Sequence, residues 1–497
     1  MLALLDETDQ RRIFILEVLM EQLGWITIGE LAQRVFASER TIQTDLVFFK
    51  NAWGDRLNLD VSQKHGVRLL CRSYATLHAL SIEIVKNAVA PRLICDLFLF
   101  PDQSMEFYTN KLFTSKSTLL RQIPKINAYL SRMNVFIERG SAGLHLFSPD
   151  EHSLRKLIAS SYVELNPGLT NQQCATTALA VPFAVDLVDF SKLCDLVRAV
   201  LLRAKDADAA SLALSDPSIL PEMTAFYLVS LVREQQGFHA ESTRMETAPV
   251  SPDELHSVQK IFPSIRETQL LLIHEVLTEP FLALGADAIA LLRREPAAFY
   301  ARVFSALHVS CPPQTQEKLS CSLEVLYRYA LVRPIRAAGM IRRVSGFSSS
   351  LRVCHPKLYA AFQESLAVFS GAMQLDLMPN LPDLILRACY LFPALAMAAP
   401  TRKLLVVSDS GQDHAEFVAN FVRALFNGTH YQTIVIQTIP YEEALHADLD
   451  ARYPEEEILI TTDPALLSLQ TRKTVLLFQD FPSTENFGQL YDVIYRS

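Results

Sequence analysis

The sequence predicts a multidomain, mainly α-helical chain that ends in a small α/β domain. Three observations support this prediction. An ungapped internal repeat occupies the N-terminal part, helical apolar periodicity continues through the middle, and strands alternate with helices near the C-terminus. The chain has 497 residues, of which 50% are apolar and 20% charged. This length and composition exclude a disordered chain and allow several separate cores.

The repeat appears when the sequence is laid over itself with an offset of 77 residues. The stretches RVFASERTIQTDL and KLFTSKSTLLRQI then align, and their apolar positions follow the spacing of one helix face. Ser38 and Ser115 stand in the N-cap position, where a hydroxyl can accept a hydrogen bond from a free backbone N–H. Alternating segments around Gly66 and Gly143 follow, and each predicts a β-hairpin.

Each copy has the order helix, helix, turn, helix, hairpin, which is typical of a winged helix-turn-helix. We therefore predict two such modules, at residues 1–72 and 73–151. The apolar face of the long helix would hold it in place, and its polar face would enter the major groove of duplex DNA. DNA binding is assigned to residues 27–72 and 104–147. Pro124 lies inside the second long helix, where it removes a backbone hydrogen bond and predicts a kink.

The candidate DNA contacts fall into two groups. Those on the N-terminal face of each long helix, which would meet base edges, are Ser38, Arg40, Thr41, Gln43, Thr44, Ser115, Lys116, Ser117, Thr118 and Arg121. Those at the helix ends and hairpins, which would meet phosphates, are Lys50, Lys64, His65, Arg68, Lys125, Arg132 and Arg139. A winged helix can also serve protein contacts, and the two copies together favour DNA.

Charge favours the second module as the electrostatic anchor. Residues 108–140 carry six Lys or Arg against one Glu, whereas the first 72 residues carry nine basic and ten acidic residues. Phosphate contacts supply most nonspecific affinity for DNA, so the more basic module should contribute more of it. The net charge of the whole chain is −8, which excludes a protein that is basic over its entire surface.

Residues 152–397 are helical in period and poor in glycine, which predicts two helical bundles, at 152–250 and 251–397. A polar, proline-containing segment at 241–254 marks the linker between them. We find no HExxH, GxSxG or phosphate-binding glycine loop, so we predict no enzyme activity, no cofactor and no metal site. Four histidines are candidates for a function, although a lone helical histidine is more often structural: His239, His256, His274 and His308.

The last part of the chain, residues 398–497, predicts a small parallel α/β sheet. The apolar strands RKLLVVSDS, YQTIVIQTI, EEILITTD and KTVLLFQDF alternate with helices there. The loop SDSGQD joins the first strand to the first helix, where it could bind an anion or form a plain turn with a helix cap.

Membrane insertion and export are not predicted. No run of about 18 apolar residues occurs, and the N-terminus lacks the basic start and long apolar core of a signal peptide. Eight scattered cysteines without a CxxC pair are typical of reduced thiols. We therefore expect a cytoplasmic protein.

Together, these five parts resemble the Mga/AtxA-like virulence and global regulators of Gram-positive bacteria. The sharpest local matches are RVFASERTIQTDL and KLFTSKSTLLRQI. The resemblance implies a transcriptional regulator, usually an activator, that binds double-stranded promoter DNA as a homodimer or higher homo-oligomer. It implies that the bundles are phosphotransferase-system regulation domains (PRDs), tuned by histidine phosphorylation through the phosphocarrier protein of the sugar phosphotransferase system. The last domain would be IIB-like and would promote oligomers.

The sequence departs from this family pattern in two places. A working IIB protein carries a phosphorylatable cysteine in its first loop, but the loop here is SDSG, which favours a structural or dimerising role. A PRD typically places a histidine about seven residues before an arginine on a long helix. Counting back seven residues from Arg233 and from Arg333 reaches Phe226 and Leu326, so the expected histidines are missing. The candidate sites of regulatory phosphorylation are therefore His308 and His274.

Two alternatives to DNA binding belong to different classes. The first is a phosphotransferase-system component or signalling partner that acts through protein contacts without binding DNA; it would need a phosphorylatable residue in SDSGQD. The second is a hydrolytic enzyme, for which we cannot assemble a nucleophile, a base and an orienting acid from the sequence.

Overall fold

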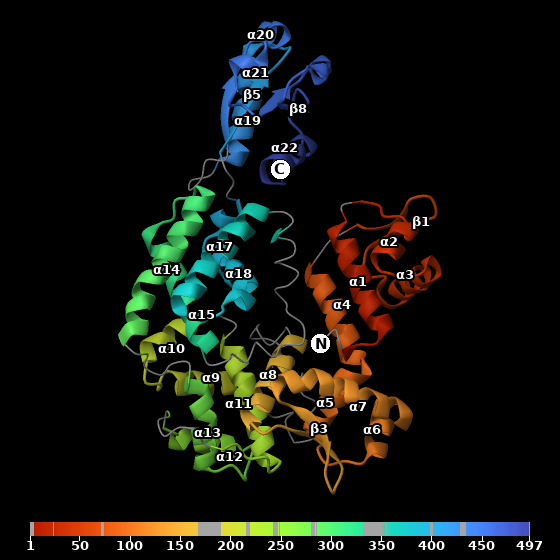
Figure 1. Cartoon of the computed structure of the whole chain (residues 1–497), viewed down its shortest axis with the longest axis vertical. Coiled ribbons are helices and arrows are strands. Elements are labelled where there is room, and N and C mark those ends of the chain that lie inside the picture. Colours follow the sequence, from red (N-terminus) through yellow and green to blue (C-terminus); the bar gives the residue numbers. More distant parts are fainter. Residues whose placement is uncertain are drawn as a thin grey trace. The chain divides into compact units, whose positions relative to one another are not determined.

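The computed structural model describes most of the chain: residues 4–22, 24–70, 74–166, 190–214, 219–241, 247, 249–279, 284, 286–331, 351–352, 355–397, 401–427 and 434–496. The described chain is mainly helical with small sheets, as the sequence predicted (Figure 1). It divides into two compact units, residues 1–283 with 328–346 and residues 284–327 with 347–497.

The first repeat consists of three helices and an antiparallel hairpin: α1 (Glu7–Glu21), α2 (Ile28–Arg34), α3 (Glu39–Trp53), β1 (Leu59–Ser62) and β2 (Gly66–Leu69). One face of α3 is buried, and its apolar members are Ile42, Leu46, Phe49 and Trp53. This apolar face holds α3 in the module, while Arg40 and Gln43 remain exposed on the other side.

The second repeat follows with one more helix: α4 (Tyr74–Asn87), α5 (Val89–Leu99), α6 (Met105–Leu112), α7 (Lys116–Leu130), the short 3-10 helix η2 (Ser131–Met133), β3 (Phe136–Arg139) and β4 (Leu144–Phe147). Both α7 and β3 begin and end 77 residues after α3 and β1. Pro124 does not interrupt α7, which is one helix of 15 residues. Pro124 and Leu120 are both exposed, so water can bond to the carbonyl that the proline leaves free.

A helical bundle completes the first unit: α8 (Glu151–Leu165), α9 (Phe190–Leu201), α10 (Ala207–Leu214), α11 (Ile219–Gln235), α12 (Pro252–Gln259) and α13 (Glu267–Thr278). The central helix is α11, which is buried along nearly its whole length and packs against α8, α9 and α13. Glu254 of α12 binds Tyr227 of α11 and His274 of α13. Thus α12 and α13, which lie beyond the predicted boundary at residue 250, belong to the same compact unit as α11.

The second unit begins with helices: α14 (Ala286–Leu307), α15 (Pro313–Leu331), α17 (Pro356–Met373), η7 (Met378–Asn380), α18 (Leu381–Leu391) and η8 (Pro393–Met397). Helices α14 and α17 pack along each other. Phe299 of α14 contacts Phe362 and Phe369 of α17 edge-on, which fills the space between the two helices.

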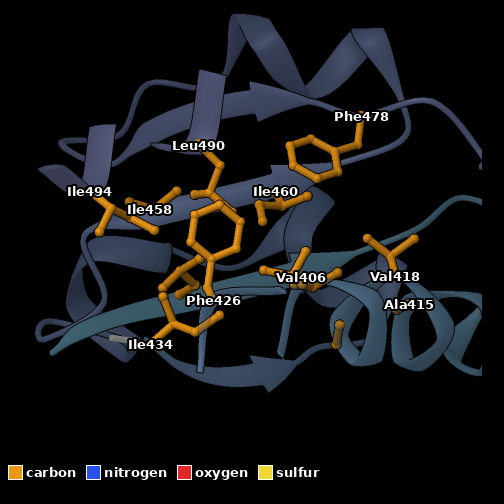
Figure 2. Packing of buried hydrophobic residues seen from close by; sticks show 13 residues of the cluster. Val406, Ala415, Val418, Phe426, Ile434, Ile458, Ile460, Phe478, Leu490 and Ile494 are labelled. Atoms are coloured by element: carbon orange, nitrogen blue, oxygen red, sulfur yellow. The ribbon is translucent and has the colours of Figure 1, made fainter. Parts of the chain in front are cut away.

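The chain ends in the α/β part of the second unit: β5 (Arg402–Val407), α19 (Gln412–Phe426), β6 (Ile434–Thr438), α20 (Tyr441–His446), α21 (Leu449–Arg452), β7 (Ile458–Thr461), η9 (Pro464–Ser468), β8 (Thr474–Leu477) and α22 (Thr484–Arg496). The four strands are parallel in the order β6-β5-β7-β8, as the buried apolar runs predicted. Figure 2 shows the core on one face, where Val406 and Ile460 of the sheet meet Val418 and Leu490 of α19 and α22.

Candidate nucleic-acid interface

The two long helices of the repeats, α3 and α7, begin in the same way. The Oγ of Ser38 accepts a hydrogen bond from the Thr41 backbone N–H (3.2 Å), and the Oγ of Ser115 accepts one from Thr118 (3.1 Å). Both serines are therefore the N-caps that the sequence predicted. Their hydroxyls also lie 2.8 and 2.9 Å from the hydroxyls of the same threonines, so these four polar groups are already engaged in fixing the helix start.

The remaining helix candidates form the exposed surface of each long helix. Arg40, Gln43, Thr44 and Lys50 are exposed on α3, and the exposed candidates on α7 are Lys116, Ser117, Arg121 and Lys125. The Thr44 hydroxyl donates to the Arg40 carbonyl at 3.0 Å, which leaves its acceptor side open. The structure thus brings long polar side chains together on the face opposite the buried stripe.

One position on α7 has different chemistry from its equivalent on α3. Leu120 follows Gln43 by 77 residues and is 54% exposed. It lies between Lys116 and Arg121, both of which are exposed. An apolar residue at this position cannot donate to a base, so the two faces would not read the same sequence.

The candidates near the hairpins differ in how free they are. Lys64 is exposed in the first hairpin, and Arg132 and Arg139 are exposed in the second module. Arg68 is different, because its Nη2 lies 3.0 Å from an Asp60 carboxylate oxygen and its guanidinium lies over the Trp25 ring. The ion pair with Asp60 would have to open, or be shared, before Arg68 could contact a phosphate.

A close backbone approach joins each hairpin to the chain just before the helix that precedes the long helix of its module. Ile26 pairs with Val67, and Gln103 pairs with Leu144. A Cβ atom added at Gly66 would lie 2.0 Å from the Ile26 carbonyl oxygen, and one at Gly143 would lie 2.2 Å from that of Gln103. Gly66 also has a φ of 93°. Both glycines are therefore required for the hairpin to reach the helices.

The turn before each long helix carries an exposed aromatic residue. Helices α2 and α6 end in the same motif, in which Ala37 N–H donates to Ala32 O (2.9 Å) and Thr114 N–H donates to Thr109 O (3.0 Å). The left-handed residue in each motif, usually glycine or asparagine, is Phe36 (φ 55°) or Phe113 (φ 52°). These side chains are 93% and 92% exposed. The repeat pairs the two phenylalanines, but nothing in the local sequence indicates that both are exposed.

Two sets of contacts join the modules to each other and to the rest of the first unit. At the end of α3, Trp53 Nε1 donates to Glu83 of α4 (2.9 Å), and Arg56 pairs with the same carboxylate (2.7 Å). These hydrogen bonds lower the pKa of Glu83, and the bond from Trp53 has the larger effect. The Gln236 side chain, just after α11, donates to the Phe98 carbonyl of α5 in the second module (2.9 Å). The modules are therefore packed parts of the unit.

The two candidate phosphorylation sites have different surroundings. His274 is fully buried, and its Nε2 lies 2.7 Å from a Glu254 carboxylate oxygen. His308 is exposed and takes the left-handed conformation (φ 54°) after the end of α14. A phosphate donor could approach His308 directly, whereas His274 would first need the surrounding helices to open. Arg333 lies outside the described residues.

A third histidine, His239, lies beside a buried charge network that the sequence did not reveal. Its Nδ1 lies 2.6 Å from a carboxylate oxygen of Glu234, and its side chain is 62% exposed. Glu234 also receives a hydrogen bond from the buried Arg155 (2.7 Å). Burial alone would raise the pKa of Glu234, but the hydrogen bonds from Arg155 and His239 outweigh it and lower that pKa. The residues come from segments far apart in sequence, so no local pattern could have predicted the network.

The loop after β5, which could have been an anion site or a plain turn, is occupied by its own hydrogen bonds. Ser408 is buried, and its Oγ lies 2.8 Å from His414 Nδ1 and accepts the Ser410 backbone N–H at 3.0 Å. His414 Nε2 lies 2.8 Å from the Asp480 carbonyl oxygen. These contacts tie the loop to α19 and to the segment after β8.

Two features are absent from the described part of the chain. No helix there is both long and apolar enough to cross a membrane. No group of three His, Cys, Asp or Glu side chains there is arranged to hold a metal ion.

Comparison with known proteins shows a distant similarity over part of the chain. No protein-family model matches the chain. A protein of Streptococcus pneumoniae serotype 4, named "Putative trans-acting regulator", is 25% identical to it over 133 residues. The matched stretch covers 27% of this chain and 27% of that protein.

Proposed function

We propose that this protein is a transcriptional regulator that binds duplex DNA through its two N-terminal repeats, acting as winged helix-turn-helix modules. The observation that carries the proposal is the doubled arrangement in which a capped helix presents a polar, partly cationic face beside a hairpin. The distant similarity to a protein named as a trans-acting regulator supports a regulatory role.

The physical case rests on the exposed faces of α3 and α7. The major groove of B-DNA is wide enough for one α-helix, and Arg and Gln side chains at the start of that helix can pair with guanine and adenine edges. Arg40 and Gln43 lie at the start of α3, and both are exposed to solvent. The basic surface of the second module would supply phosphate contacts and hold the protein on the duplex.

The finer features of the proposal come from the family resemblance. The regulator would be of the Mga type, an activator rather than an enzyme, and a homodimer or higher homo-oligomer. A dimer would place four long helices on one DNA site, and the linked modules would rebind at high effective concentration. Tuning by a phosphocarrier protein of the phosphotransferase system would act on His308 more readily than on His274, because only His308 is exposed.

Binding of the full-length protein to DNA tests the proposal. Duplexes are first selected by the wild-type protein from a random-sequence library, and binding is then measured for two double variants, Arg40→Ala with Gln43→Ala and Lys116→Ala with Arg121→Ala. The matched control is Gln314→Ala with Lys318→Ala, two exposed residues of α15 in the other compact unit.

We expect each module variant to bind at least tenfold more weakly, because a bidentate contact between a side chain and a base contributes about 1–3 kcal/mol. The control should bind like the wild type. Loss of sequence preference would identify base contacts, and uniform weakening would identify phosphate contacts. If the wild-type protein binds no duplex at low salt, the proposal is wrong, and a signalling partner that acts through protein contacts takes its place.

A further inference from the structure

We propose that Phe36 and Phe113 are apolar DNA contacts that pack against thymine 5-methyl groups at the edge of the major groove. This inference rests on the proposed function, because it assigns a further contact to the same interface. It differs from that function in naming the chemical group of DNA that the turns recognise.

The first argument is the exposure of the two rings. Phe36 is 93% exposed and Phe113 is 92% exposed, whereas the next most exposed large apolar side chain among the described residues is Tyr390 at 75%. Burying a phenylalanine is among the largest favourable contributions of any side chain, so leaving one in water is unfavourable. The same exposure at equivalent positions of two otherwise divergent repeats indicates a partner that is absent when the protein is alone.

The second argument is that the rings stand on a defined backbone. Each phenylalanine is the left-handed residue of a hydrogen-bonded helix end, with its own N–H donating to Gln33 O or Asn110 O at 3.3 Å. Glycine or asparagine would take this conformation with less strain than phenylalanine. The backbone requirement therefore does not explain the aromatic side chain, and strained residues that persist in this way are often functional.

The third argument is the charge around the rings, which selects the class of partner. In the sequence, Phe36 is flanked by the exposed Arg34 and Arg40, with the exposed Glu39 beside Arg40, and Phe113 is followed by the exposed Lys116. Exposed cations within a few residues of each apolar ring fit a polyanion that also offers apolar groups. A purely apolar groove of another protein would fit this surface poorly.

Duplex DNA presents such a combination at the place where these residues would lie. Each phenylalanine precedes the N-cap serine of α3 or α7 by two residues, so it is attached to the end of the helix that would enter the major groove. The apolar group on base edges in that groove is the thymine methyl, which phenylalanine can contact. Such a contact neutralises no phosphate, so it should not change the dependence of binding on salt.

The test is a double variant of the full-length protein, Phe36→Asn with Phe113→Asn. Asparagine accepts the left-handed conformation, so the fold should be kept, and thermal unfolding checks this. The matched control is Phe481→Asn, a 65% exposed phenylalanine near the C-terminus. Binding is measured on a duplex that the wild type selected from a random library and on the same duplex with deoxyuridine in place of thymidine.

We expect the double variant to bind the thymidine duplex about tenfold more weakly, with an unchanged salt slope and unfolding temperature. The wild type should lose about 15-fold on the deoxyuridine duplex, since each of the two buried methyl groups contributes about fourfold, whereas the variant should bind both duplexes equally. The Phe481→Asn control should behave like the wild type on both.

Two results would overturn the inference while leaving DNA binding in place. The first is a double variant that binds DNA like the wild type. If that variant also fails to activate transcription, the rings contact a protein partner instead. The second is a double variant that loses the same factor in affinity, relative to the wild type, on the thymidine duplex and on the deoxyuridine duplex. Failure of the wild type to bind any duplex at low salt would instead reject the proposed function itself, so the two failures are distinguishable.

Discussion

Asp45 is a buried carboxylate in α3 that joins the third helix of the first repeat to the first helix. Arg11 Nε lies 2.7 Å from one of its oxygens, and Arg12 Nε lies 3.0 Å from the other. The Arg12 guanidinium also lies 3.6 Å from the centre of the Phe48 ring. These contacts fix the angle of α3, and hence the direction in which its polar face points.

We predict that Asp45→Asn destabilises the first unit by about 2 kcal/mol, because one partner of a buried ion pair is removed. The expected loss is smaller than for a fully buried pair, because both arginines are partly exposed to solvent. Urea unfolding would measure the change, with the exposed Asp55→Asn as the control. A loss in Asp45→Asn no larger than that in Asp55→Asn would show that the ion pairs do not hold α3.

Glu254 gives a pH-dependent contribution to the same unit. Burial would raise its pKa, but hydrogen bonds from His274, Arg203 and Tyr227 outweigh burial and lower the pKa below its usual value of 4.5. A carboxylate whose pKa is lowered by folding stabilises the protein above the unfolded value, and this contribution is lost as the pH falls through the folded value. The stabilisation should therefore be complete at pH 7 and decline below about pH 4.5.

We predict that Glu254→Gln lowers the free energy of unfolding at pH 7 by about 2 kcal/mol, because His274 and Arg203 lose their anion. The difference from the wild type should shrink as the pH falls below the unfolded pKa of about 4.5 and through the lower pKa of the native carboxylate. Chemical unfolding at several pH values would measure it, beside the exposed Glu241→Gln control. A difference that stays constant over this range would contradict the assignment.

Among the elements, the hairpins depend on glycines that allow their backbone to approach the rest of the module. We predict that Gly66→Ala and Gly143→Ala each cost about 2–4 kcal/mol, because the new methyl group would overlap a backbone carbonyl that cannot move alone. Gly24→Ala is the matched control, since a Cβ there meets nothing within 4 Å. Thermal unfolding would measure the loss. An unfolding temperature for either variant equal to that of the control would mean that the hairpin can shift.

Local sequence signals were sufficient for elements whose causes are local. The N-cap serines Ser38 and Ser115, followed by apolar stripes at helical spacing, predicted where α3 and α7 begin. The buried apolar runs predicted the four parallel strands of the last domain. Pro124 lies at an exposed position within α7, which is one helix of 15 residues.

Features that depend on long-range pairing could not be read from the sequence. The carboxylate of Glu254 meets Tyr227 and His274 from other helices, and Arg155 meets Glu234 across 79 residues of sequence. No periodicity indicates such partners. Helix α13 packs against α11 and α9, and no periodicity indicates that either. The candidate DNA contacts on the helices were accessible to prediction, because amphipathic spacing alone places them on the exposed face.

For the complete chain, the two modules should differ in how they contribute to binding. Arg132→Ala with Arg139→Ala removes two candidate phosphate contacts from the basic module and should make the plot of log affinity against log salt less steep by about 2, because each phosphate contact releases about one counterion. Arg40→Ala with Gln43→Ala removes candidate base contacts and should change sequence preference more than that slope. Anisotropy titrations between low and moderate salt would measure both slopes. A slope for the Arg132→Ala with Arg139→Ala variant equal to that of the wild type would mean that these two residues contact no phosphate.

Footprinting of the full-length protein on a duplex that it has selected tests DNA reading by both repeats most directly. We expect two protected stretches for each bound chain, one of which weakens when Arg40 and Gln43 are replaced by alanine and the other when Lys116 and Arg121 are replaced. If each variant weakens both protected stretches to the same extent, the modules do not read separate sites. No protection at low salt would contradict DNA binding altogether.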